Sequence, residues 1–138
     1  MPHENVLITG GAGFIGSNFI PFFMNTNPGV KVFNLDKLTY AGNLDNLRSI
    51  EDHELYTFIK GDICDSALVN EIFKKHKISH VIHFAAESHV DNSIDDPSDF
   101  IATNIQGTFN LLNTSYQHWM KAPFISRPEF VNSRFHHI

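Results

Sequence analysis

A glycine-rich turn between a buried strand and a helix most constrains what this chain can fold into. Asn5–Thr9 is an apolar run of strand length, and the segment Phe14–Asn25 has helical spacing. Between them stands the sequence Gly10-Gly11-Ala12-Gly13-Phe14-Ile15-Gly16. Glycines in this context allow a sharp turn, a close approach of backbone amides to a phosphate, and tight packing of helix on strand. The pattern indicates a dinucleotide-binding turn, with a purely structural turn as the alternative.

Short apolar runs alternate with longer segments of helical period along the rest of the chain. Strands are expected at Asn5–Thr9, Lys31–Asp36, Tyr56–Lys60, His80–Phe84 and Arg134–Ile138, and helices at Phe14–Asn25, Leu44–Ile50, Ser66–His76 and Ser98–Met120. This alternation predicts an α/β fold, a doubly wound parallel sheet of Rossmann-like type with strand order 3-2-1-4-5. The ligand crevice is expected where the order reverses, between the first and fourth strands.

Local signals support two of the helices. Asp65 directly precedes Ser66–His76, where its carboxylate can cap open backbone amides. The helix Ser98–Met120 carries apolar residues at steps of three and four, which gives it one apolar face: Phe100, Ile101, Ile105, Phe109 and Leu112. Gly107 inside this helix indicates either a close helix–strand contact or the approach of a ligand.

A carboxylate stands where a dinucleotide-binding fold needs one. Asp36 ends the second expected strand, about 20 residues beyond Gly16. A carboxylate at this place accepts hydrogen bonds from the adenosine ribose hydroxyls and repels the 2′-phosphate of NADP. Asp36 therefore favours NAD, although Lys37 beside it weakens the discrimination. A solvated acid at the end of a strand is the alternative.

Residues that follow the third and fourth expected strands are further candidates for cofactor contacts. Asp62 comes just after Tyr56–Lys60, where it can face the adenine edge, although a plain turn residue explains it too. Ala85 and Ala86 follow the fourth strand, and their small side chains leave room for the nicotinamide half of the cofactor. Tight packing of a loop explains these two alanines equally well.

Composition bounds the class of protein and its partners. The 138 residues suit one domain or part of one, and a formal net charge of −5 gives no field that attracts nucleic acid or an anionic membrane surface. No apolar stretch approaches the ~18 residues of a membrane span. The single cysteine, Cys64, excludes an internal disulfide and favours a cytoplasmic location. The histidines show no metal-ligand spacing, so no metal is expected.

Several longer segments together resemble one enzyme family. They are Thr9–Gly16 (TGGAGFIG), Asn34–Asn43 (NLDKLTYAGN), Lys60–Cys64 (KGDIC), His83–Asp91 (HFAAESHVD), Thr103–Thr108 (TNIQGT) and Phe135–Ile138 (FHHI). They resemble the dTDP-glucose 4,6-dehydratases, which are extended short-chain dehydrogenase/reductases of the NAD-dependent epimerase/dehydratase family. The resemblance covers nearly the whole chain. TGGAGFIG alone indicates only the wider nucleotide-sugar group, whereas LDKLTYAGN together with AAESHVD is more specific.

The resemblance implies NAD as a tightly held cofactor and a nucleotide sugar, dTDP-glucose, as substrate. The cofactor-binding residues that it implies are Gly10, Gly13, Phe14, Ile15, Gly16, Asp36, Lys37, Leu38, Thr39, Asp62, Ile63, Phe84, Ala85, Ala86, Ser88 and Thr103. Ser88 and Asp91 fall where the family touches the sugar nucleotide. Asn92 stands where the family usually has Arg, which clamps a hydroxyl or phosphate with two hydrogen bonds.

The implied reaction is that of a lyase. The family oxidises the sugar C4 hydroxyl by hydride transfer to NAD, eliminates water across C5 and C6, and returns the hydride to C6. Its Tyr–Lys pair with a helping Ser or Thr, and its Asp–Glu pair, follow the FHHI segment. The resemblance therefore places no catalytic residue within residues 1–138.

We thus expect an incomplete NAD-binding domain, truncated at the fifth strand and inactive by itself. Intact members of the family are expected to form homodimers, and this chain is expected to self-associate through an open sheet edge and apolar surface. Two alternative functions stay open. One is another NAD-dependent nucleotide-sugar enzyme, an epimerase or a decarboxylase. The other is a non-catalytic dinucleotide-binding module.

Overall fold

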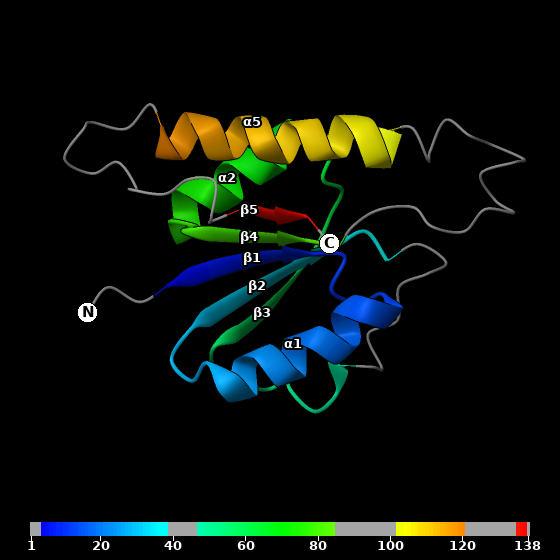
Figure 1. The fold of residues 1–138 in the computed structure, drawn as a ribbon, viewed down its shortest axis with the longest axis vertical. Coiled ribbons are helices and arrows are strands. Elements are labelled where there is room, and N and C mark those ends of the chain that lie inside the picture. Colours follow the sequence, from blue (N-terminus) through cyan, green and yellow to red (C-terminus); the bar gives the residue numbers. More distant parts are fainter. Residues whose placement is uncertain (1–3, 39–46, 85–101, 121–134, 138) are drawn as a thin grey trace, which may run out of the picture.

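The computed structural model describes residues 4–38, 47–84, 102–120 and 135–137. These residues form a parallel sheet of five strands in the order β3-β2-β1-β4-β5, which confirms the predicted doubly wound α/β fold (Figure 1). The strands are β1 (Asn5–Thr9), β2 (Lys31–Asp36), β3 (Tyr56–Lys60), β4 (His80–His83) and β5 (Phe135–His137). The fourth strand thus ends one residue earlier than predicted, and Arg134 and Ile138 of the expected fifth strand lie outside the described residues.

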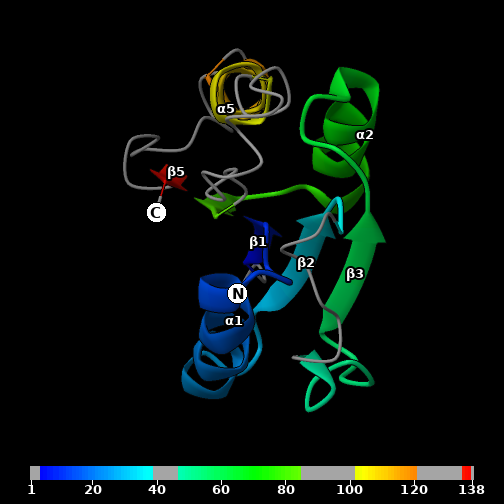
Figure 2. The same cartoon turned by 90° about the vertical axis from the view of Figure 1, so that its right-hand side faces the viewer.

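Helices cover both faces of the sheet (Figures 1 and 2). Helix α1 (Phe14–Thr26) lies on one face, and α2 (Ser66–His76) and α5 (Thr108–Trp119) lie on the other. A π-helical turn, η2 (Ala102–Gly107), leads directly into α5. Right-handed crossovers explain this division, because the step from β1 to β2 runs in one direction across the sheet, whereas the steps from β3 to β4 and from β4 to β5 run in the other.

The core is divided into two layers by the sheet, because successive side chains of a strand point to opposite faces. Leu7 of β1 packs with residues of α2 and α5, whereas its neighbours Val6 and Ile8 pack with residues of α1. All three side chains are at most 2% exposed. The central strand therefore holds the two layers together.

Side-chain hydrogen bonds fix one end of each helix in the layer of α2 and α5. The Asp65 side chain accepts a hydrogen bond from the Leu68 amide at 3.1 Å, which confirms the predicted cap of α2. The buried indole of Trp119 at the end of α5 donates to the carbonyl of Ile78 at 2.8 Å. This bond ties the last turn of α5 to the segment that enters β4.

The expected helix Leu44–Ile50 is wrong in the part that the structure describes. Leu47 lies in a 3₁₀ turn and residues 48–50 form hydrogen-bonded turns, in which the Ile50 amide donates to the Leu47 carbonyl at 3.1 Å. Leu47 and Ile50 are nevertheless buried against the α1 layer. These two residues bury the connection between β2 and β3 against the core. A spacing of three residues occurs in a tight turn as well as in a helix, so the periodicity does not distinguish the two.

Three of the five apolar residues predicted on one face of the last helix are turned to solvent, and the other two, Phe100 and Ile101, lie outside the described residues. Ile105, Phe109 and Leu112 are 63%, 67% and 47% exposed, and Tyr116 continues their row at 51%. The face of α5 that packs on the core instead carries Leu111, Thr114, Ser115 and Trp119. The helix thus has an apolar stripe, Ile105-Phe109-Leu112-Tyr116, that nothing within the described residues covers.

Gly107 lies at a close contact between two segments. A Cβ atom built on Gly107 would come 2.4 Å from Cδ1 of Ile63, which follows β3. Asn110, one turn further on, donates to the Ile63 carbonyl at 2.6 Å. Of the two explanations that the sequence allows for this glycine, the structure therefore shows close packing of the helix.

Candidate dinucleotide-binding site

The predicted site residues that the structure describes gather at the carboxyl edge of the sheet. The glycine bend follows β1, Asp36 ends β2, Asp62 follows β3, and Phe84 follows β4. The order reverses between β1 and β4, which lie side by side in the sheet. In open α/β sheets this edge and this reversal are where ligands bind.

The glycine bend is shaped by hydrogen bonds from the next strand. Gly10 has a φ of 72°, a left-handed conformation that favours glycine, and its amide donates to the Leu35 carbonyl at 2.9 Å. The next two amides are taken by side chains of β2. Gly11 donates to Oδ1 of Asn34 at 3.0 Å, and Ala12 donates to Oδ2 of Asp36 at 2.9 Å.

The amides left for a ligand are therefore those of Phe14, Ile15 and Gly16. Within the described residues these three have no protein acceptor, and the first intrahelical bond runs from Ser17 to the Gly13 carbonyl at 2.9 Å. Such open amides, with the positive end of the helix dipole, favour an anion such as a pyrophosphate. The side chains of Phe14 and Ile15 are 82% and 62% exposed, so they do not cover these amides by packing into the core.

Asp36 is held in place for a hydrogen-bonding role. Its carboxylate accepts from Ala12 through Oδ2 and from the Leu38 amide through Oδ1 at 2.7 Å, and the residue is only 9% exposed. Each carboxylate oxygen has a second lone pair that can accept from a ribose hydroxyl. Leu38 has a φ of 57°, a costly conformation for a branched residue that the bond to Asp36 helps to hold.

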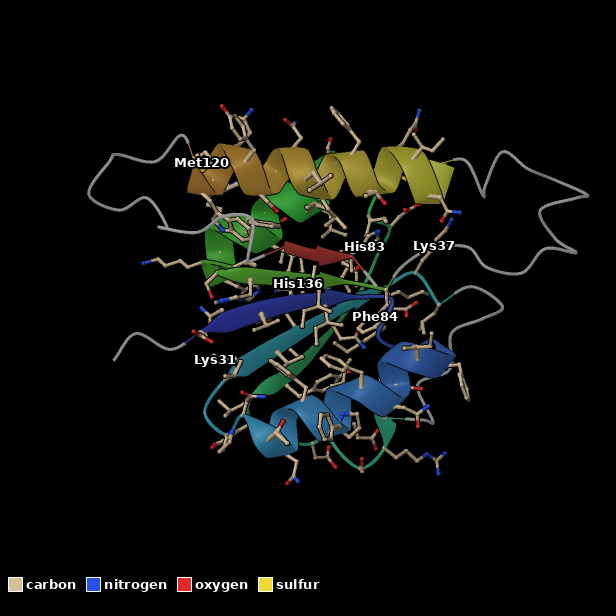
Figure 3. All side chains as sticks on the ribbon, viewed as in Figure 1. Lys31, Lys37, His83, Phe84, Met120 and His136 are labelled. Carbon is tan, nitrogen blue, oxygen red and sulfur yellow. The ribbon has the colours of Figure 1, made fainter. Side chains whose placement is uncertain are left out.

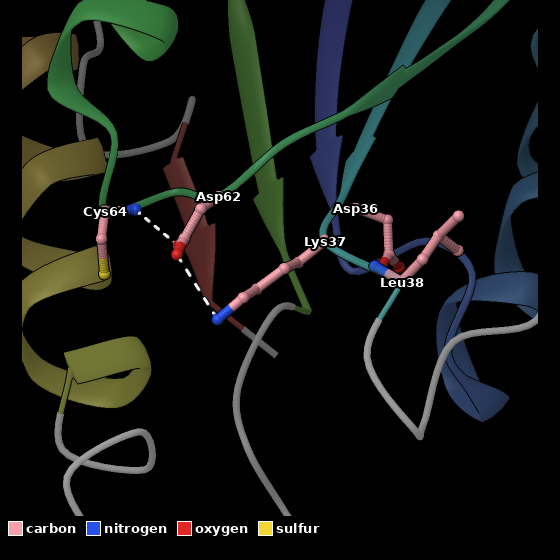
Figure 4. A network of polar contacts seen from close by, with 5 residues as sticks. All are labelled: Asp36, Lys37, Leu38, Asp62 and Cys64. Carbon is pink, nitrogen blue, oxygen red and sulfur yellow. Dashed lines mark hydrogen bonds and ion pairs between the residues drawn. The ribbon is translucent and has the colours of Figure 1, made fainter.

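An ion pair bridges the ends of β2 and β3 beside this carboxylate (Figure 4). Nζ of Lys37 lies 3.5 Å from Oδ2 of Asp62, whose Oδ1 accepts from the Cys64 amide at 2.9 Å. Both side chains are partly exposed. Burial raises the pKa of the Cys64 thiol, and the Asp62 carboxylate raises it further. The thiol therefore stays protonated near neutral pH and is a poor nucleophile.

Two predicted cofactor residues are largely turned into the protein. The Ile63 side chain is 4% exposed and belongs to the core on the α2 side. The Phe84 ring packs on Phe19 of α1, with ring centroids 5.3 Å apart. Thr39, Ala85, Ala86, Ser88, Asp91 and Asn92 lie outside the described residues, and of Thr103 only the backbone in η2 is described.

Sequence reasoning missed the polar side chains that support this edge. His83 is fully buried at the end of β4, with Nδ1 2.6 Å from the Thr9 hydroxyl and Nε2 2.9 Å from the Thr108 hydroxyl (Figure 3). Asn34 is fully buried in β2. The one feature of the sequence that could have indicated a role for Asn34 is its position two residues before Asp36, which places both side chains on the same face of an otherwise apolar strand.

Nothing in the described part of the chain forms a metal centre, because no three His, Cys, Asp or Glu side chains gather there. Its helices are also too short or too polar to cross a bilayer. The described groups at this edge offer hydrogen bonding and a partial positive charge, which suit the recognition of a phosphate-bearing ligand.

A sequence profile described as GDP-mannose 4,6 dehydratase matches residues 7–138. The chain belongs to this family. The resemblance to dTDP-glucose 4,6-dehydratases is confirmed by relatives that carry that name. The Escherichia coli dTDP-glucose 4,6-dehydratase is 49% identical over 133 residues, which are 96% of this chain and 36% of the relative. The Neisseria gonorrhoeae enzyme of the same name is 47% identical over 98% of this chain and 38% of its own length.

Solved structures of other proteins agree with the fold. The dTDP-glucose 4,6-dehydratase DesIV from Streptomyces venezuelae, crystallised with NAD and TYD, matches with a TM-score of 0.78 and 41% identity over 83% of this chain and 36% of that one. A UDP-glucose 4-epimerase from Thermotoga maritima, with UDP-glucose, matches at 0.73 and 33% identity over 83% and 35%. This chain thus spans about a third of the length of the proteins it matches.

Proposed function

We propose that the chain binds NAD and forms the dinucleotide-binding part of a dTDP-glucose 4,6-dehydratase. One observation supports the cofactor most directly: the open amides of Phe14, Ile15 and Gly16 lie at the start of α1, and the Asp36 carboxylate is held at the end of the adjacent strand. A pyrophosphate and a ribose of one dinucleotide need these two groups side by side. Several similar structures were crystallised with NAD.

In this proposal the whole protein is a lyase. It oxidises the C4 hydroxyl of dTDP-glucose with NAD, removes water across C5 and C6, and returns the hydride to C6. Residues 1–138 contribute the cofactor site, with Ser88 and Asp91 at the nucleotide sugar, and the acid–base groups lie elsewhere. The names of the relatives at 47–49% identity support this reaction over others of the family.

Calorimetric titration of the 138-residue chain tests the cofactor. We expect saturable binding of NAD, and weaker binding of NADP because Asp36 opposes a 2′-phosphate. The absence of any heat of binding at millimolar NAD would contradict the proposal and favour a module without a dinucleotide. The reaction is tested with a chain extended to the length of the relatives, by measuring the formation of the 4-keto-6-deoxy product from dTDP-glucose. Residues 1–138 alone should form no product.

A nucleotide-sugar epimerase is the second candidate. The UDP-glucose 4-epimerase structures match this chain with 33% identity, and Asn92 departs from the usual Arg of the dehydratases. A panel of nucleotide sugars offered to the extended chain separates the two candidates. Epimerisation of UDP-glucose without loss of water would overturn the dehydratase assignment and leave the NAD site intact.

The apolar stripe on α5 supports a homodimer as a further part of the proposal. Ile105, Phe109, Leu112 and Tyr116 repeat at steps of four, three and four residues, the spacing of a helix face that packs on another helix. Two copies that bring this stripe together would remove its side chains from water. The net charge of −5 supports the absence of nucleic acid among the partners, and the single cysteine supports a cytoplasmic location.

A further inference from the structure

Asn34 is a fully buried amide in a strand whose other inward positions are apolar or acidic. It lies in the middle of β2, with an exposed fraction of 0%. A buried amide that leaves its hydrogen bonds unmade is costly, so its partners indicate why the residue is there. Both ends of the Asn34 side chain have a partner, and one partner belongs to the glycine bend.

The two hydrogen bonds of Asn34 run in a fixed direction. Its Oδ1 accepts from the Gly11 amide at 3.0 Å, so its Nδ2 must face the other way, where it donates to the Tyr56 hydroxyl at 3.1 Å. Burial raises the pKa of Tyr56 above its ordinary value, although the bond to Asn34 opposes the rise. The hydroxyl therefore remains neutral near pH 7 and can accept from the amide.

The contact between Asn34 and the bend is also tight. A Cβ atom on Gly11 would lie 2.3 Å from Oδ1 of Asn34 and 2.4 Å from Cδ1 of Ile20. The backbone at Gly11 therefore rests directly on the Asn34 side chain. Together with the bond from Ala12 to Asp36, two successive amides of the bend are held by alternate residues of β2.

We propose that Asn34 is a positioning residue for the cofactor site: it holds the glycine bend in the shape that turns the next open amides toward the pyrophosphate, and Tyr56 orients it. The part of this proposal that concerns the pyrophosphate rests on the proposed NAD function. The part that concerns the shape of the glycine bend is independent of that function. Since Tyr56 acts only through Asn34, removing both side chains should cost no more cofactor affinity than removing Asn34 alone.

The first experiment measures amide exchange by NMR in the absence of NAD, on the wild-type chain and on Asn34→Leu. We expect the Gly11 and Ala12 amides to exchange at least about tenfold faster in Asn34→Leu. Asn5→Leu provides the matched control, because Asn5 also makes a long-range bond, from Nδ2 to the His76 carbonyl at 2.7 Å, but at the opposite end of β1. Asn5→Leu should leave the bend amides unchanged. Equal exchange of these amides in wild type and Asn34→Leu would overturn the proposal.

The second experiment is a double-mutant cycle on NAD affinity with Asn34→Leu, Tyr56→Phe and the double variant. We expect the dissociation constant to rise at least about tenfold in Asn34→Leu, by less in Tyr56→Phe, and in the double variant no further than in Asn34→Leu. Additive losses would overturn the role of Tyr56, and unchanged affinity in a folded Asn34→Leu would overturn the role of Asn34. If wild type binds no NAD, the proposed function fails, and the exchange rates alone decide whether Asn34 holds the bend.

Discussion

Nδ1 of His83 lies 2.6 Å from the hydroxyl of Thr9, and both side chains are fully buried between the ends of β4 and β1. The other ring nitrogen meets the Thr108 hydroxyl at 2.9 Å. A single side chain thus joins two strands and the first turn of α5 beside the expected crevice. The glycine bend begins at Gly10, directly after Thr9, so this link also holds the strand that leads into the bend.

Replacing His83 should destabilise the fold. His83→Leu leaves the buried Thr9 hydroxyl and the partly buried Thr108 hydroxyl without this partner, and a buried unpaired hydroxyl costs about 1–3 kcal/mol. We expect the free energy of unfolding, measured in urea, to fall by about 2 kcal/mol or more. His136→Leu, at an exposed position on β5, should change it by less than about 0.5 kcal/mol. Equal effects of the two substitutions would contradict the structural role of His83.

Two glycines of the bend should respond differently to alanine. A Cβ on Gly16 would lie 2.6 Å from the Gly10 carbonyl oxygen and 2.7 Å from the Gly11 Cα, whereas a Cβ on Gly13 would meet only the Gly10 oxygen at 3.4 Å. Gly16→Ala should lower the free energy of unfolding by about 1–3 kcal/mol, and Gly13→Ala should change it by less than about 1 kcal/mol. Both substitutions should weaken NAD binding: Gly16→Ala would displace the bend, and a Cβ on Gly13 would fill space that we expect the pyrophosphate to occupy. Urea unfolding and calorimetry on the same samples separate the two effects.

Removing the charge of Asp36 should change the choice of cofactor. In Asp36→Asn one carboxylate oxygen becomes an NH₂ group, which cannot accept from Ala12, Leu38 or a ribose hydroxyl. We expect the dissociation constant for NAD to rise by about tenfold or more, which is ~1.4 kcal/mol. The preference for NAD over NADP should fall, because the repulsion of a 2′-phosphate is lost. A preference that stays as large as in wild type would show that another group discriminates between the cofactors.

A charge on the apolar stripe of α5 should prevent association. Phe109 is 67% exposed on this stripe, and Phe22, on the other face of the molecule, is 65% exposed. Phe109→Glu should shift the chain toward the monomer in sedimentation experiments, because the dimer would bury two unpaired carboxylates. Phe22→Glu is the matched control and should leave association unchanged. A wild-type chain that stays monomeric at high concentration would contradict the proposed homodimer.

Acidification should weaken the fold through two histidines near the packed ends of α2 and α5. Burial lowers the pKa of His118, aided by Lys74, and burial also lowers the pKa of His76, aided by Lys75 and Lys31. The unfolded chain therefore binds more protons than the folded one below about pH 6.5, so the free energy of unfolding should fall from pH 7 to pH 5. The double variant His76→Gln/His118→Gln should have a flatter slope in urea titrations across this range. An unchanged slope would show that other groups control the pH dependence.

The sequence predicts the elements of this fold better than the contacts that tie them together. The strands and the helices α1 and α2 follow from periodicity and from signals a few residues apart, such as Asp65 and Leu68. The partners of His83 are not predictable in this way, because Thr9 stands 74 residues earlier in the chain. Pattern alone also does not tell which apolar face of a long helix meets the sheet, and on α5 the predicted face is the exposed one.

For the candidate site, too, the sequence predicts the residues better than the contacts between them. The glycine turn and Asp36 were predicted from a known spacing, and the structure brings them together at one edge. The spacing did not show that the Gly11 and Ala12 amides are already bonded to Asn34 and Asp36. Which amides stay open depends on side chains of the neighbouring strand, and that is settled only when β1 and β2 pair in register.

The contact of Gly107 with Ile63 has a consequence for how sequences of this kind vary. The two residues share one space, since even a single methyl group at 107 would overlap Cδ1 and Cγ1 of the isoleucine. Their sizes are therefore coupled although the two residues stand 44 positions apart in the sequence, and an alanine at 107 is expected only in relatives that have a shorter side chain at 63. Such paired exchanges, in which a gain in volume on the helix accompanies a loss in the loop, would mark this contact in an alignment before any coordinates were known.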